Sequence, residues 1–254
     1  MEDTAKRPSG KPELSMQSNN KSISSIRLFR TSLHPCSYKK SEEAATVFVD
    51  PDLIIDKRLN SKLSNLGYRR SGAHLYRPDC DRCSACISCR VLVDDFRLSR
   101  SQRRIIKRNE VLSVVEQADL NSAAAFDLYC RYVDRRHQGG DMFPATDEQF
   151  EAFIKTKTVD TRFFTFYEDQ RLIAVSVVDL LEQGLSAVYT FFEPDLPQRS
   201  LGNFIILWQI NKCRELGLSY LYLGYWIKDC AKMGYKSKFR PMEFLIDGNW
   251  TSVV

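Results

Sequence analysis

The sequence lacks any apolar run long enough to cross a lipid bilayer, because even the apolar segment Phe204 to Ile210 is far too short. Its first residues are polar and contain no apolar stretch of the kind that forms the centre of a secretory signal. These absences argue against a membrane-spanning protein and against export. We therefore expect a cytoplasmic protein with no membrane partner.

Histidine is also scarce, with only three residues in the chain. No spacing suggests the Ser-His-Asp or Cys-His arrangements in which a histidine activates a nucleophile. His137 falls where a helix is expected to end, and there its charge would complement the helix dipole. We therefore assign no histidine to catalysis.

What the chain does contain is the composition of an ordinary globular protein. It has 254 residues, of which 43% are hydrophobic, enough for one large domain or two modest ones. Residues 1–25 are rich in Ser, Asn, Lys and Pro, and they predict a disordered leader. We expect an N-terminal domain with the cysteines and a basic helix over residues 26–110, and a second domain over residues 111–254.

The second half predicts a mixed α+β order of elements. After two helices, β-branched and aromatic runs predict three consecutive antiparallel strands over residues 163–167, 172–180 and 185–192. A helix from Ser200 to about Leu216 follows, and then strands over residues 220–226 and 243–246. This order resembles the core of the GNAT-type acyltransferases, so we expect such a core beside a smaller N-terminal domain that carries the cysteines.

In that fold, the loop before the helix presents backbone N–H groups to a pyrophosphate. A helix N-terminus favours an anion for physical reasons, because its free N–H groups and its dipole both attract negative charge. In this chain the loop is formed by Gln198, Arg199, Ser200 and Gly202. An N-capping serine in a loop is common, however, so the match has little specificity on its own.

The cysteines form an unusual pattern. Eight cysteines in a reducing compartment do not predict a disulfide framework. Four of them follow one another at three-residue intervals, at Cys80, Cys83, Cys86 and Cys89. Closely spaced thiolates can ligate an iron–sulfur cluster, whereas zinc prefers two separated pairs. Thiols packed as small apolar side chains are an equally good interpretation.

A second pattern is a run of charge of one sign. Between Arg97 and Asn109 there are six basic residues and no acidic residue, and we expect a helix from Ser99. The basic residues are Arg97, Arg100, Arg103, Arg104, Lys107 and Arg108. A solvated helix face is the simplest interpretation, but such a run repels itself unless a polyanion binds there. The imbalance therefore favours a nucleic acid, whose affinity would depend on salt.

Ten short segments together resemble the bacterial branch of the arginyl/leucyl-tRNA–protein transferase family. The resembling segments are 34–38 (HPCSY), 67–72 (GYRRSG), 76–78 (YRP), 80–86 (CDRCSAC), 101–104 (SQRR), 184–192 (GLSAVYTFF), 200–202 (SLG), 220–227 (YLYLGYWI), 230–233 (CAKM) and 235–236 (YK). They occur in order, and the resemblance extends over nearly everything after residue 30. Cys89 stands where the family is more often apolar.

The resemblance implies a cytosolic enzyme that moves leucine from leucyl-tRNA to the α-amine of proteins with N-terminal Asp or Glu. The product would be a degradation signal in the N-end rule pathway. Leucine rather than arginine as the donor follows from the resemblance alone. Because the aminoacyl ester is already activated, the reaction needs neither a cofactor nor a covalent enzyme nucleophile. The enzyme would have to position two substrates, help to neutralise the amine and stabilise the oxyanion.

Specific residues can be matched to these tasks. The acidic side chain of the acceptor needs cations, and arginine binds a carboxylate with two hydrogen bonds. We therefore name Arg69, Arg70 and Arg77 as its candidate ligands, against the alternative that they are solvated strand charges. For catalysis we name Tyr189, Tyr222 and Tyr225, because a tyrosine hydroxyl can polarise the ester carbonyl or protonate the leaving oxygen.

The resemblance also bears on the cysteines. Eukaryotic relatives are thought to bind an iron–sulfur cluster through N-terminal cysteines, which implies Cys36, Cys80, Cys83 and Cys86 as the ligand set. Zinc, or thiols without any metal, remain alternatives.

Two other functions stay open beside this one. The first is an acyl-CoA-dependent N-acyltransferase built on the same core, which would bind coenzyme A at residues 198–202 and need no tRNA. The second is a non-enzymatic cysteine-cluster protein that binds nucleic acid or senses redox state. That protein would leave Tyr189 and Tyr222 without a role.

Overall fold

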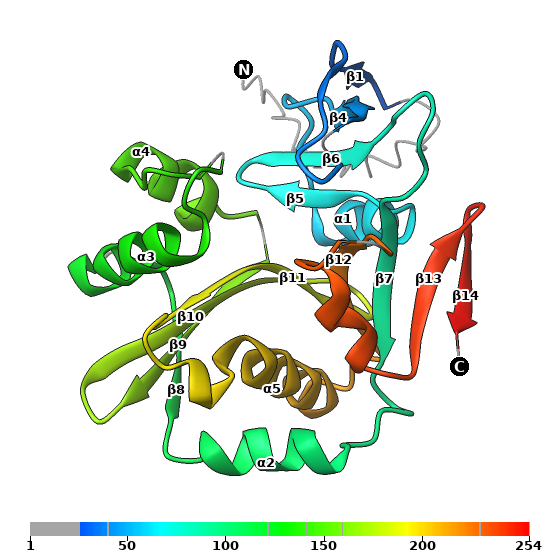
Figure 1. Ribbon diagram of the computed structural model, residues 1–254. Helices are drawn as coiled ribbons and strands as arrows, with labels where there is room; N and C mark the ends of the chain where they lie inside the picture. Colours follow the sequence, from blue (N-terminus) through cyan, green and yellow to red (C-terminus); the bar gives the residue numbers. More distant parts are fainter. Residues whose placement is uncertain are drawn as a thin grey trace, which may run out of the picture.

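Two β-sheets of unequal size organise the computed structural model, which describes residues 26–39, 41–120, 122–140, 142–158, 160–228 and 230–253 (Figure 1). The leader expected over residues 1–25 lies outside the described residues. A four-stranded sheet belongs to the N-terminal part, and an eight-stranded sheet runs through the rest. The fold is therefore mixed α/β. No helix in the described ranges is both long and apolar enough to span a membrane.

The smaller sheet has the order β1-β4-β6-β5 and is entirely antiparallel. Its strands are β1 (Leu28–Arg30), β4 (Thr46–Val49), β6 (His74–Pro78) and β5 (Arg69–Ser71), and the short strands β2 (His34–Pro35) and β3 (Glu43–Ala44) pair beside it. Helix α1 (Lys57–Asn65) is capped by the Asp56 carboxylate, which accepts from Leu59 N. The helix ends before Gly67, whose φ of +86° is a left-handed conformation that favours glycine.

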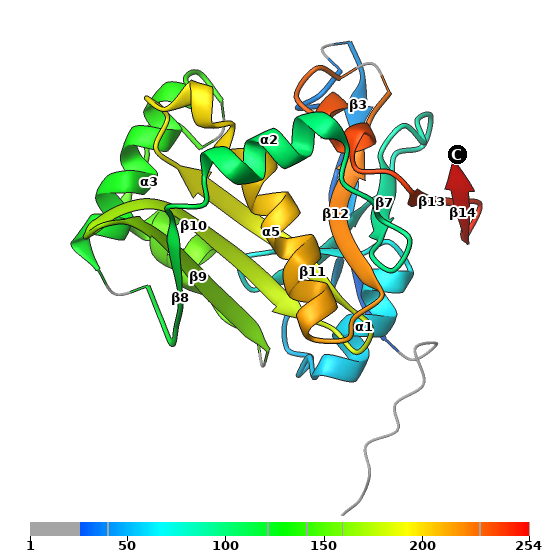
Figure 2. The same cartoon turned by 90° about the horizontal axis from the view of Figure 1, so that it is seen from below.

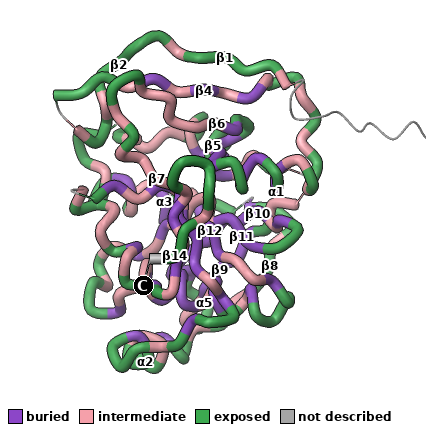
Figure 3. The backbone as a smooth tube through the Cα atoms, turned by 90° about the vertical axis from the view of Figure 1, so that its right-hand side faces the viewer, coloured by how far each residue is buried: buried purple, intermediate pink, exposed green. Residues whose placement is uncertain are grey.

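The larger sheet has the order β14-β13-β7-β12-β11-β10-β9-β8. Its strands are β7 (Ile87–Leu92), β8 (Ser113–Gln117), β9 (Thr161–Glu168), β10 (Arg171–Leu180), β11 (Gly184–Phe192), β12 (Tyr220–Trp226), β13 (Met242–Ile246) and β14 (Asn249–Val253). The three consecutive antiparallel strands expected from the sequence are β9, β10 and β11. The next strand, β12, runs parallel to β11, and buried residues concentrate in these central strands (Figure 3).

Helices cover both faces of the larger sheet. Helix α5 (Leu201–Glu215) packs on β11 and β12, and α2 (Arg100–Arg108) lies outside it (Figure 2). The opposite face carries α3 (Ala123–Arg136), α4 (Asp147–Gln149) and a π-helical turn, η2 (Phe150–Lys155). Two 3-10 turns, η3 (Pro197–Arg199) and η4 (Gly234–Lys238), flank α5 and β12. The smaller sheet lies on the same side as α3 (Figure 1).

The N-terminal part contributes a strand to the middle of the larger sheet. Strand β7 pairs with β12 on one side and with β13 on the other. Helix α2 likewise contacts α5 rather than the smaller sheet. The boundary expected at residue 110 therefore does not coincide with the change of sheet, which occurs between β6 and β7. Both parts share one hydrophobic core, because Val91 and Phe96 pack in the same cluster as Ile205 and Leu221.

Strands β11 and β12 separate soon after they meet. They pair only where Gly184–Ser186 faces Tyr220–Tyr222. A Cβ on Gly184 would approach Tyr220 O to 2.6 Å, so the close approach of the strands requires glycine there. Beyond Ser186 and Tyr222 the two strands are no longer paired with each other. The second half of β11 can therefore face α3 and β5.

Candidate active site

Strand β5 carries two adjacent arginines with opposite environments. The Arg70 guanidinium forms a two-pronged ion pair with Asp179, at 2.7 and 2.8 Å, and both side chains are 1% exposed. It also donates to Gly72 O and Thr156 O. Arg70 therefore holds β5 on β10 and has no capacity left for a substrate carboxylate.

Arg69 is equally buried but has no such partner. Its Nη2 atom donates to Cys89 O at 3.3 Å, while Nε and Nη1 are buried without a hydrogen-bond partner. The guanidinium lies 5.2 Å from the centre of the Tyr222 ring. Burial lowers the pKa of Arg69, since desolvation disfavours its charged form. The third expected arginine, Arg77, lies over the Tyr68 ring and is partly exposed.

A second buried cation lies close to Arg69. Lys236, in η4, is 5% exposed and its Nζ donates to Tyr225 O. The pKa of Lys236 is lowered to about 8, chiefly by burial and in part by the Arg69 charge, while Cys89 and Cys230 act in the opposite sense. A Cβ on Gly224 would meet only Lys236 Nζ, at 3.6 Å. In the described part of the chain, neither Arg69 nor Lys236 forms an ion pair.

Sequence reasoning did not single out Lys236 as a site residue. Its position beside Arg69 results from a contact between η4 and the strands at the centre of the sheet, and nothing local in the sequence reveals it. The available signal was its place in the family-like segment 235–236 (YK), which carried no role.

The three expected catalytic tyrosines differ in what their hydroxyls bind. The Tyr222 hydroxyl donates to Asn65 Oδ1 and accepts from Arg90 Nη1 at 3.0 Å. The Tyr225 hydroxyl lies 2.8 Å from Gly67 O and 3.2 Å from Tyr76 O. Both hydroxyls therefore connect β12 to the part of the chain that contains α1 and β6. Among the described residues, the Tyr189 hydroxyl has only Met142 Sδ as a partner, at 3.4 Å, and burial raises the pKa of Tyr189.

Tyr189 lines a cavity of about 200 Å³ between β5, α3, α4 and β11. A β-bulge shapes its wall. Val177 pairs with Tyr189 and Val178 pairs with Ala187, so Val188 is an extra residue in β11. Bulges redirect side chains, and here both Val188 and Tyr189 line the cavity although they are neighbours in a strand. The bulge therefore turns two neighbouring residues of β11 toward the same cavity.

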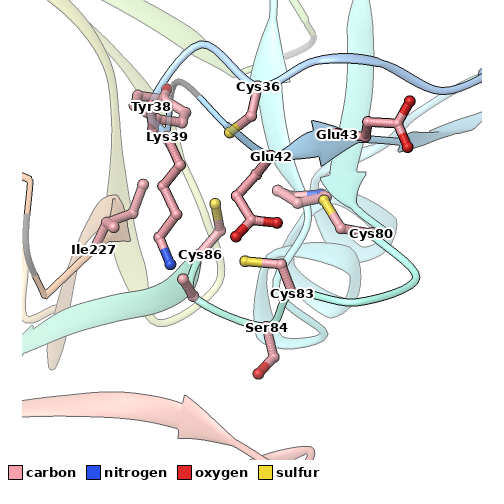
Figure 4. A pocket seen from close by; sticks show the side chains of 12 residues that line it. Cys36, Tyr38, Lys39, Glu42, Glu43, Cys80, Cys83, Ser84, Cys86 and Ile227 are labelled. Atoms are coloured by element: carbon pink, nitrogen blue, oxygen red, sulfur yellow. The ribbon is translucent and has the colours of Figure 1, made fainter.

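The cysteines expected as metal ligands gather around a second, smaller pocket, which we call the cysteine pocket and define by Cys36, Cys80, Cys83 and Cys86 (Figure 4). The pKa of the Cys86 thiol is raised to about 11, chiefly by burial and in part by the other three thiols. Glu42 and Lys39 also face this space.

Cys89 lies apart from these four, because it is fully buried in the main core and its thiol contacts Gly224 O. As arranged, no three His, Cys, Asp or Glu side chains within the described ranges form a group that could hold a metal ion. The cysteine pocket therefore brings the four thiols to one place on the protein.

The expected basic helix is α2, and its charges face solvent. Ser99 and Gln102 form a capping box at its start, and Ile105 and Ile106 pack toward the core. The six basic side chains at positions 97, 100, 103, 104, 107 and 108 are all exposed. None of them forms an ion pair that the structure records within its described residues. This leaves a cationic surface without anionic partners on the protein.

The loop at the start of α5 is partly structural. The Arg199 guanidinium is buried and binds Asn109 and Glu168, at 3.0 and 2.9 Å. A Cβ on Gly202 would lie 3.1 Å from the Phe192 ring, so this glycine permits close packing. Gln198 O accepts a hydrogen bond from Arg108, which joins the loop to the end of α2.

Known proteins share the sequence pattern. A family model for the N terminus of arginine-tRNA-protein transferase matches residues 34–104, and one for its C terminus matches residues 124–246. The chain is 50% identical to an aspartate/glutamate leucyltransferase of Alcanivorax borkumensis over 90% of this chain and 94% of that protein. It is 48% identical to one of Teredinibacter turnerae over 91% and 96%. Among solved structures, FemX matches with a TM-score of 0.46 and 7% identity, over 87% of this chain and 86% of that chain.

Proposed function

The chain belongs to the arginine-tRNA-protein transferase family, and from this we infer that it transfers leucine from leucyl-tRNA to the α-amine of proteins that begin with Asp or Glu. Members of this family are aminoacyltransferases, and their substrates are an aminoacyl-tRNA and a protein. We place this reaction in the cytoplasm, where both substrates are found. Modification of N-terminal Asp or Glu in this way marks a protein for degradation by the N-end rule.

The observation that carries the acceptor specificity is the pair of buried, unpaired cations. Arg69 has two nitrogen atoms without a partner among the described residues, and Lys236 lies near enough for the two charges to interact. Burying a charge without a compensating anion costs roughly several kcal/mol for each ion. We assign the side-chain carboxylate of the acceptor's first residue to this pair. Arg70 and Arg77 are left with structural roles.

The same cations assist the chemistry. The acceptor's α-amine must be neutral to attack, and its reference pKa is about 8. Nearby positive charges disfavour its ammonium form and therefore lower that pKa further. The amine nitrogen then bonds to the leucyl carbonyl carbon, the ester C–O bond breaks, and the amine proton passes to the leaving oxygen of the tRNA.

Tyr189 is the tyrosine that we retain for this reaction. Its hydroxyl holds its proton at neutral pH and is bound only by a thioether. It can therefore donate to the oxyanion or to the leaving oxygen. Correct positioning of the two substrates supplies the largest part of the acceleration, up to about 7–11 kcal/mol in favourable cases.

The tRNA would bind along α2. The exposed cations of this helix have no anionic partners among the described residues, and Arg108 reaches the loop that precedes α5. That loop follows β11, whose middle lines the cavity at Tyr189.

We also propose that β9, β10, β11, α5 and β12 form a GNAT-like core. Two features support this: the order of these elements along the chain, and the parallel pair β11 and β12, whose strands separate after a short paired segment.

A transfer assay tests the function. The protein is incubated with leucyl-tRNA and peptides that differ only in the first residue, which is Asp, Glu, Arg or Met. We expect a leucine on the Asp and Glu peptides and none on the others. Modification supported by an acyl-CoA without tRNA would favour the acyltransferase alternative, and equal modification of the Met peptide would refute the acid-binding pair.

A further inference from the structure

The cavity beside Tyr189 has the volume for an amino-acid side chain. It measures about 200 Å³, and its apolar wall is formed by Met142, Phe153 and Val188. For comparison, an apolar cavity of about 150 Å³ accommodates a molecule as large as benzene. The four-carbon side chain of leucine is smaller than benzene. The cavity can therefore hold this side chain together with the α-carbon and its amine.

Two polar atoms at this cavity are buried and have no partner. They are the Tyr129 hydroxyl and Gln149 Oε1. Tyr129 is 0% exposed. A buried polar group without a hydrogen bond costs about 1–3 kcal/mol. Because Gln149 Oε1 is an acceptor and the phenol oxygen can also accept, the missing partner is a hydrogen-bond donor.

The charges around the cavity define the ligand further. Arg70 is the charged residue on its lining, and Asp179 neutralises it in a pair that is 1% exposed on both sides. No carboxylate on the described lining is free to pair with a guanidinium. An arginyl side chain would therefore be buried beside Arg70 without an anion. A leucyl group brings no cation on its side chain, so its apolar side chain has the better complementarity to this lining.

We propose that this cavity receives the leucyl group of the donor, with the side chain against Met142, Phe153 and Val188 and the α-ammonium on Gln149 Oε1 and the Tyr129 hydroxyl. The assignment rests on the proposed function, because it presupposes an aminoacyl donor. It places the ester carbonyl at the Tyr189 end of the cavity. It also gives the selection of leucine over arginine a physical basis, which the sequence does not supply.

The first test changes the size of the cavity. Val188→Phe should lower kcat/KM for leucyl-tRNA by at least about tenfold, at a saturating concentration of the Asp peptide. Val188→Ala should raise the use of tRNA charged with phenylalanine relative to leucine by a similar factor. Val111→Phe is the matched control, because Val111 is 62% exposed and is not among the residues that line the cavity. Affinity for uncharged tRNA should stay unchanged in all three variants.

The second test removes the ammonium contact and stays informative if Val188→Phe fails to fold. The wild-type protein should prefer leucyl-tRNA to N-acetyl-leucyl-tRNA by about tenfold or more, since the acetylated donor lacks the ammonium. Gln149→Leu should lose most of that preference, because it removes the Oε1 acceptor that binds the ammonium of leucyl-tRNA and not the acetylated amine.

The outcomes separate the two hypotheses. A wild-type protein that transfers no leucine would refute the proposed function itself. If the wild type is active, an unchanged donor preference in Gln149→Leu would overturn the cavity assignment alone. If Val188→Phe or Gln149→Leu raised the KM for the acceptor peptide but not the KM for leucyl-tRNA, the assignment would also be overturned, because the cavity would then hold the acceptor.

Discussion

Replacing Arg69 and Arg70 one at a time by methionine separates a functional charge from a structural one at adjacent positions. Methionine keeps much of the length of arginine but carries no charge. Arg70→Met leaves the Asp179 carboxylate buried and uncompensated, because the pair is 1% exposed on both sides. Removing one partner of such a pair costs about 3–5 kcal/mol. In a chain of this size that loss corresponds to a fall in Tm of about 6–20 °C.

Arg69→Met should behave in the opposite way. It removes one hydrogen bond of 3.3 Å to Cys89 O, and it also removes a buried cation with two unpartnered nitrogens. These effects oppose each other, so we expect a Tm close to that of the wild type. Activity should fall instead. A hydrogen bond to a charged group contributes about 1.5–3 kcal/mol, so kcat/KM for the Asp peptide should drop about ten- to a hundredfold.

The assay compares thermal unfolding with steady-state transfer to Asp and Met peptides for both variants. The informative quantity is the ratio of kcat/KM for Asp to that for Met, because general damage to the fold lowers both together. Arg69→Met should collapse this ratio, and whatever Arg70→Met protein remains folded should keep it. An Arg69→Met protein that unfolds as early as Arg70→Met, or that still selects Asp, would refute the reasoning.

Three further results are expected. The Asp-to-Met ratio of kcat/KM should fall above about pH 8, because Lys236 loses its proton there. In Lys236→Met the same ratio should be low and independent of pH. A wild-type ratio that does not change with pH would contradict this. Arg100→Glu combined with Arg104→Glu should weaken tRNA binding and reduce the slope of log affinity against log salt by about one unit or more, whereas Arg58→Glu on α1 should do neither. Protein purified in air should contain no stoichiometric iron or zinc, and a chelator should leave its Tm unchanged; bound metal would show that the thiols of the cysteine pocket rearrange into a ligand set.

Local patterns predicted much of the fold, and long-range contacts explain the rest. The run of cations after Ser99 predicted α2, and the apolar alternation after residue 160 predicted β9 to β11, because both signals lie within one element. The position of β7 between β12 and β13 could not be predicted, since its partners lie more than 120 residues away and its apolar pattern suits either sheet.

The site shows the same division. Sequence reasoning named Arg69, Arg70 and Arg77 together, and Tyr189 together with Tyr222 and Tyr225, but it could not rank the members of either set. Arg70 differs from Arg69 only because Asp179, 109 positions later, neutralises it. Gln149 and Lys236 were missed for the same reason, because their neighbours come from other elements. The bulge at Val188 is also invisible in the sequence, since it depends on how β10 pairs with β11.

The insertion of β7 into the centre of the larger sheet imposes an order on biosynthesis. The ribosome completes β7 long before residues 220–246 exist, so both edges of this buried strand wait for their partners. Until then an apolar strand with open hydrogen-bonding groups is exposed to other nascent chains. The large sheet therefore closes late in translation, and a fragment that stops before β12 should aggregate or recruit chaperones rather than fold as a separate unit.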